Sequence, residues 1–286
     1  MTITVAMIND LRQRTNAGMM DCKKALIQTD GDMEAAIKVL REKGLAIQVK
    51  RADKESKQGI IQALTSADGK TVAMAEVNTE TDFVAATDNF KKFVNTVTTK
   101  VLEGTEDLDG ALKEDLMTII SQTGENVKIR RTARYTLEGS AILASYIHMG
   151  GKIGVIIEVG AEKAETLTAS AFTELVHDLT LQIAANAPRY IAGTEVPQAE
   201  VDAELEIKLN ALKEQKGKLP PEQALVGIKK GMTQKFFSEI CLLDQPFVKN
   251  GVGDKTTISQ LIAKIGKDLG DTITVKRFVR YQLGAK

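Results

Sequence analysis

Histidine and cysteine, which build many catalytic and metal sites, are scarce in this sequence. Its 286 residues include only two histidines, His148 and His177, and two cysteines, Cys22 and Cys241. Neither histidine lies at a metal-ligand spacing from a cysteine, so no metal site is predicted. Two cysteines so far apart in sequence are typical of reduced thiols in a cytosolic protein rather than of a disulfide framework.

An excess of charge and a long apolar run are also absent. The formal net charge is +0 and the pI is about 6.8, which removes the simplest reason to expect binding to nucleic acid. A basic cluster at 128–134 occurs on a predicted strand, where it is more typical of a solvated face. No run of about 18 apolar residues and no signal-peptide pattern occur, so we expect a cytoplasmic protein without membrane contact.

No sequence motif of an enzyme is found. The pair Gly150-Gly151 lacks the following helix of a phosphate-binding loop, and no serine has the context of a nucleophile elbow. These absences predict a binding protein with no catalytic residues, no metal and no cofactor of its own. An enzyme that uses His148 with Asp82 is an alternative, but it lacks a third group to position the pair.

One connection, at 78–84, combines an aromatic ring with a carboxylate. It follows a strand-like run at 71–77 and precedes a helix-like run. Connections lie on the surface and often carry function. One interpretation is that Thr81 or Asp82 caps a helix and Phe83 returns to the core. The other is that Phe83 and Asp82 are presented to a pocket of a partner protein.

Residues 1–55 are predicted to form a three-helix module, similar to ubiquitin-associated domains, and a linker. Turn residues, Asn16 and Gly18 among them, precede the second helix. Asp32 fits the N-cap of the third helix, and Gly44 is placed at its C-terminal end. The polar stretch 48–57 is predicted as the linker.

The remainder is predicted to be an α+β core of two related halves with antiparallel sheets, 56–139 and 140–196 with 239–286. Each half contains a hairpin, a helix and a returning strand, and a second loop at 146–150 is expected at the place equivalent to 78–84. The copies match at Phe90, Phe93, Val94 and Val97 against Phe172, Leu175, Val176 and Leu179, and at Arg131, Arg134, Tyr135 and Leu137 against Arg277, Arg280, Tyr281 and Leu283.

An insertion at 197–238 interrupts the second half. Its two helices carry narrow apolar stripes on a charged background and are separated by a Gly/Pro-containing breaker at 217–221. Such a pair is typical of an antiparallel helical hairpin of the coiled-coil type. A hairpin of this kind could remain solvated or pair with a second copy.

Four segments of the chain resemble signatures of bacterial elongation factor Ts, the nucleotide exchange factor of elongation factor Tu. They are LRQRTNAGMMDCKKAL at 11–26, EVNTETDFV at 76–84, GENVKIRR at 124–131 and SYIHMGGKIGV at 145–155. Together with the order of the modules, the resemblance covers essentially the whole chain.

This resemblance implies a translation elongation factor that binds elongation factor Tu, GDP-bound and nucleotide-free, and accelerates GDP release. The helical module would dock on the G domain of Tu, and the 78–84 connection would enter near its magnesium and phosphate site. The inserted hairpin would be the coiled coil with which some members self-associate. The residues implied for the exchange site are Thr81, Asp82, Phe83 and Val84, and those implied for further partner contacts are Arg12, Met19, Met20, Ile147, His148 and Met149.

Several positions depart from the family pattern. Asn16 stands in place of a common glycine, Thr79 in place of a common cysteine, and Ala86 where a basic residue often follows. The chain also ends soon after 276–283, without the C-terminal helical module of longer members, so the contact of that module with Tu is expected to be absent. A different class of function, a protein-binding adaptor without exchange activity, is the alternative.

Overall fold

The computed structural model describes residues 2–15, 17–218, 220–251 and 253–285. Its helices and its two three-stranded antiparallel sheets confirm the predicted α+β class. Two compact units are present, Met1–Thr136 with Ile147–Gly154 and Tyr281–Lys286, and Leu137–Tyr146 with Val155–Arg280. The finer predicted division into four parts stays a prediction. Within the described residues, every helix is too short or too polar to span a bilayer.

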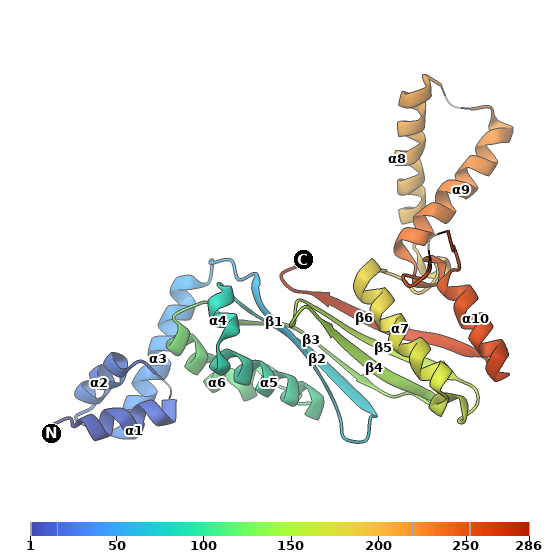
Figure 1. Cartoon of the computed structure of the whole chain (residues 1–286). Helices are drawn as coiled ribbons and strands as arrows, with labels where there is room; N and C mark the ends of the chain where they lie inside the picture. Colours follow the sequence, from blue (N-terminus) through green and yellow to red (C-terminus); the bar gives the residue numbers. More distant parts are fainter. Residues whose placement is uncertain (1, 16, 219, 252, 286) are drawn as a thin grey trace. The chain divides into compact units, whose positions relative to one another are not determined.

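Three helices form the N-terminal module, as predicted: α1 Val5–Thr15, α2 Met19–Gln28 and α3 Met33–Arg51 (Figure 1). Their buried faces share one small core, which includes Leu11, Cys22, Leu26, Ala36 and Leu40. Asp32 caps α3, since its side chain accepts from the Ala35 N–H at 3.0 Å. In the turn before α2, Gly18 is extended with φ −61°, and Asn16 lies outside the described residues.

The predicted end of α3 at Gly44 is wrong, because the helix continues to Arg51 and shortens the linker. Gly44 is buried where α3 packs against α6, which spans Leu108–Thr123. A Cβ at this position would lie 2.2 Å from the carbonyl oxygen of Met117. The glycine therefore permits the close approach of two helices instead of terminating one of them.

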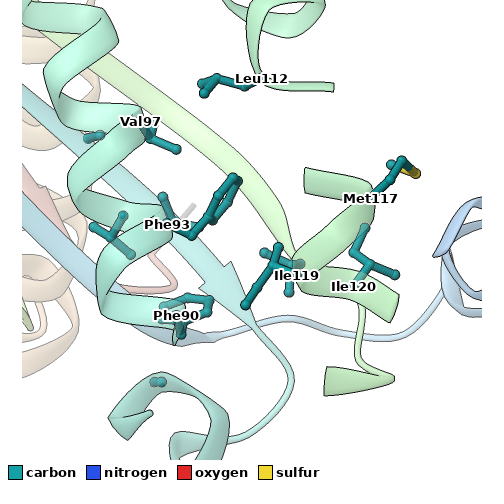
Figure 2. Close-up of a cluster of buried hydrophobic side chains, with 12 residues drawn as sticks. Phe90, Phe93, Val97, Leu112, Met117, Ile119 and Ile120 are labelled. Carbon is teal, nitrogen blue, oxygen red and sulfur yellow. The ribbon is translucent and has the colours of Figure 1, made fainter. Parts of the chain in front are cut away.

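The first sheet has the order β1-β2-β3, formed by Gln58–Thr65, Thr71–Thr79 and Lys128–Thr136. The strands β1 and β2 pair as the predicted hairpin, with Ile60 opposite Val77. Helix α5, Asp88–Glu103, packs on this sheet with its predicted apolar face, and Figure 2 shows Phe90 and Phe93 in one cluster with Ile120 of α6. Complete burial of a side chain such as Phe90 stabilises the fold by about 1.5–3 kcal/mol.

The second half repeats this order of elements. Its sheet is β4-β5-β6, formed by Ala141–His148, Ile153–Ala161 and Ile273–Gln282, and its helices are α7 Ser170–Asn186 and α10 Ile258–Leu269. Helix α10 was not predicted from the sequence, although its N-cap residues and its apolar spacing are visible there. Thr257 and Gln260 form a capping box, and the apolar face of the helix buries Ile258 and Ile262.

Two helices form the insertion, as predicted: α8 Gln198–Lys216 and α9 Glu222–Ile240 (Figure 1). Helix α9 continues past the expected end at 238. At the base of the pair Val201 and Phe236 are buried, whereas farther along Ile207 and Val226 are 64% and 71% exposed. So sparse a stripe does not establish a coiled coil, and that description stays a prediction.

Candidate functional site

The connection at 78–84 changes from strand to helix within two residues. Strand β2 ends at Thr79, and a one-turn helix, α4, spans Asp82–Ala86. Thr81 is its N-cap: the backbone is extended, and the hydroxyl accepts from the Val84 N–H at 3.3 Å. This cap fixes the directions in which the following side chains leave the backbone.

Phe83 points away from the core. Its side chain is 82% exposed, while Ala85 is buried and Val84 packs against the core. Asp82 is also exposed, at the first position of α4. The capping part of the simpler interpretation is therefore confirmed, and its placement of Phe83 in the core is wrong. Because one helical turn is not stable alone, the display of this ring depends on the surrounding contacts.

An ion pair joins the connection to the N-terminal helical module. The Glu80 carboxylate accepts from the Arg51 guanidinium at both oxygens, each at 2.8 Å, and from the Asn126 N–H at 2.7 Å. Burial alone would raise the pKa of Glu80, but the hydrogen bonds from Arg51 and Asn126 outweigh it and lower this pKa. The sequence-based reading missed the pair, because Arg51 fell in the predicted linker.

A second carboxylate, Glu125, supports the same connection from the turn after α6. It accepts hydrogen bonds from the hydroxyls of Thr79 and Thr81 at 2.7 and 2.6 Å. Thr79 is buried, and the bond to Glu125 satisfies its hydroxyl there. The role of Glu125 was also not predicted. It belongs to the segment quoted at 124–131, but nothing in the sequence indicates that it binds residues 79–81.

The β4–β5 hairpin carries the second predicted loop. Ile147 is half-buried at the end of β4, whereas His148 and Met149 are exposed, Met149 by 71%. Met149 and the two following glycines have positive φ, as a tight turn requires. The expected equivalence of the two loops is wrong. In the order of elements this hairpin turn corresponds to 66–70, not to the strand-to-helix connection.

The predicted contacts of the helical module are also exposed. Arg12 lies on the surface of α1, and Met19 and Met20 of α2 are 51% and 61% exposed. Val5, which was not predicted, is 71% exposed on the same module. These apolar side chains are therefore accessible to a partner. All of the predicted site residues, including those of the hairpin turn, belong to one compact unit.

The described ranges contain no group of three or more histidine, cysteine, aspartate or glutamate side chains arranged to hold a metal ion. What the connection offers instead is a carboxylate and an aromatic ring at the surface. Such a pair can enter a pocket of another protein, where the ring contributes buried apolar area and the carboxylate contributes charge.

Comparison with known proteins finds relatives along almost the whole chain. A family model described as Elongation factor TS matches residues 80–285. A protein named Elongation factor Ts from Nitratidesulfovibrio vulgaris is 39% identical over 289 residues, which cover 99% of this chain and 96% of that protein. A protein of the same name from Bdellovibrio bacteriovorus is 41% identical over 296 residues, with coverage of 100% and 94%. Another, from Clostridium novyi, is 37% identical over 296 residues, with coverage of 99% and 93%.

Proposed function

This chain belongs to the elongation factor Ts family, and from that membership we propose that it binds elongation factor Tu and accelerates the release of GDP. Membership makes it a translation elongation factor. The observation that carries the finer proposal is Phe83, a residue that is 82% exposed beside Asp82 on a capped and braced helical turn. Thr81 would hold this turn, and Val84 would anchor it to the core.

Acceleration of GDP release requires no acid or base. An exchange factor must bind the nucleotide-free partner more tightly than the nucleotide-bound one, because only differential affinity shifts an equilibrium. Phe83 would wedge between elements of the G domain, and Asp82 would perturb the magnesium ion that neutralises the diphosphate. Each ~1.4 kcal/mol removed from the dissociation barrier raises the release rate tenfold.

Further surfaces would contribute to the complex. The helical module would dock on the G domain, and the β4–β5 turn would make a second contact with Tu; the residues proposed for these contacts are Arg12, Met19, Met20, Ile147, His148 and Met149. The exposed Ile207 and Val226 favour the α8–α9 hairpin as a surface for self-association. A function of this kind places the protein in the cytoplasm, without direct contact to nucleic acid or membrane.

Release of a fluorescent GDP analogue from elongation factor Tu, with magnesium present, tests the proposal. The unmodified protein would be compared with Asp82→Ala, Phe83→Ala and Val248→Ala. Val248 is a matched control because it is an exposed apolar side chain outside the proposed contacts. We expect full acceleration with the control and a loss of more than about tenfold with each loop variant, since central interface anchors contribute about 2 kcal/mol or more.

The other outcomes are equally informative. Acceleration that survives both loop substitutions would keep the exchange activity and transfer its mechanism to other contacts. Formation of a stable complex without faster GDP release would favour the adaptor alternative.

A further inference from the structure

The carboxylate of Glu125 accepts four hydrogen bonds from the junction between β2 and α4. Its Oε2 accepts from the Thr79 hydroxyl at 2.7 Å and from the N–H groups of Glu80 and Thr81 at 3.1 and 3.0 Å. Its Oε1 accepts from the Thr81 hydroxyl at 2.6 Å. The two N–H groups lie beyond the strand and before the helix, where regular structure supplies no acceptor. One side chain thus satisfies the junction that precedes Asp82 and Phe83.

The Thr81 hydroxyl links Glu125 to the cap of α4. Its hydrogen is donated to Glu125, so a lone pair is left for the Val84 N–H. The junction and the turn after α6 are also hydrogen-bonded in both directions. Glu80 donates its N–H to Glu125, and its carboxylate accepts the Asn126 N–H at 2.7 Å. The orientation of Thr81 therefore depends on Glu125, and the orientation of the helical turn depends on Thr81.

The corresponding junction of the second half provides an internal comparison. Asp271, in the turn after α10, accepts from the N–H groups of Glu162 and Lys163 at 3.2 and 3.0 Å. In both halves, therefore, a carboxylate accepts the two N–H groups that follow the central strand of the sheet. In the second half the junction leads to a 3-10 helix, Thr166–Thr168, which has no aromatic residue. In the first half it leads to the turn that displays Phe83.

We propose that Glu125 is a positioning residue for nucleotide exchange, which acts through Thr81 to hold α4 so that Asp82 and Phe83 reach the partner already oriented. This inference rests on the proposed function. Without the carboxylate, the junction would have to become ordered during the encounter, and the ring would be correctly placed in a smaller fraction of complexes. Glu125 needs no contact with elongation factor Tu for this role.

Three substitutions test the positioning role. Glu125→Gln keeps the size of the side chain but replaces one acceptor by a donor that faces other donors. We expect it to lower the maximum rate of GDP release about tenfold, because a hydrogen bond to a charged group contributes about that factor. Thr81→Val, which removes the hydroxyl, should show the same loss. Asp271→Asn is the matched control: it weakens the corresponding carboxylate contact in the second half and should accelerate GDP release normally.

A protein that carries both Asp82→Ala and Phe83→Ala allows the positioning role of Glu125 to be distinguished from a general effect on stability. When Asp82 and Phe83 are both alanine, no group is left to orient, so adding Glu125→Gln should slow GDP release no further. Full exchange by Glu125→Gln, or an equal loss in both backgrounds, would overturn the inference. Full exchange without Asp82 and Phe83 would overturn it together with the wedge mechanism. Failure of the unmodified protein to accelerate release is the separate result that overturns the proposed function.

Discussion

Glu76 and Glu158 are counterparts in the two halves: each is completely buried on the central strand of its sheet and is bound by an arginine at 2.7 Å. The arginines are Arg131 on β3 and Arg277 on β6. Arg131 also lies over the ring of Tyr281, 4.3 Å from its centroid. Buried charges of this kind are tolerated because they are paired, and a buried carboxylate that loses its partner is strongly unfavourable.

Removal of one arginine should therefore destabilise the protein far more than removal of a surface ion pair. We expect Arg131→Leu to lower the free energy of unfolding by about 1.5–3 kcal/mol, because buried Glu76 would lose its closest charged hydrogen bond and keep only Arg130 at 3.8 Å. Arg14→Leu, which breaks an exposed pair with Asp10, should lower it by less than about 1 kcal/mol. Urea denaturation followed by circular dichroism measures both. Equal effects would show that Glu76 does not depend on Arg131.

The stabilising effect of the Arg51–Glu80 pair should disappear in acid. The folded protein lowers the pKa of Glu80, whereas an unfolded glutamate has a pKa of about 4.3. Folding thus favours the ionised form, and this contribution is present above about pH 4.3 and is lost as the pH falls through the lower folded pKa. Glu80→Gln should be less stable than the unmodified protein at neutral pH, and the difference should shrink toward about pH 3.

A series of urea titrations between neutral and acidic pH measures this convergence. A difference in unfolding free energy that stays constant across the series would assign the effect of Glu80→Gln to something other than its ionisation.

Two helix glycines should respond to alanine with opposite signs. At Gly44 the new methyl group would collide with the Met117 carbonyl oxygen, so Gly44→Ala should destabilise the protein by about 1–3 kcal/mol. At Gly227 on α9 the new methyl group would have no neighbour within 4 Å, so Gly227→Ala should stabilise its helix by about 0.5–1 kcal/mol. Thermal unfolding of the two variants makes the comparison. A neutral Gly44→Ala variant would show that α3 and α6 can separate freely.

Both cysteine thiols should be unreactive in the folded protein. Burial raises the pKa of Cys241 to about 11 and also raises that of Cys22, so little thiolate is present at neutral pH. An aromatic disulfide reagent should label them slowly in buffer and rapidly in urea. Fast labelling of a native thiol would show that its element opens readily.

The hairpins and the main core helices could be predicted because their causes are local. Strand alternation around Asp68-Gly69 defines one hairpin, and the spacing from Phe90 to Val97 defines the buried face of α5. The contacts that shape the candidate site have no local cause. Glu125 binds residues that lie 44 to 46 positions earlier in the chain.

The misses have related physical reasons. Helix α4 has five residues, too few for an apolar period, and it is specified by its cap and by the burial of Ala85. A glycine such as Gly44 is typical of a helix end, but here its role is set by the close backbone of Met117, which leaves no room for a side chain. Tertiary packing overrides local preference at both places.

The two halves differ in the length of the connection between their two core helices. In the second half, the connection from α7 to α10 contains α8 and α9, whereas in the first half residues 104–107 join α5 directly to α6. Loop-closure entropy grows slowly with loop length, so an equivalent connection can accept added sequence at little thermodynamic cost. The connection at 104–107 is thus a site for grafting a fluorescent reporter domain, which would follow the protein without altering the residues that display Phe83.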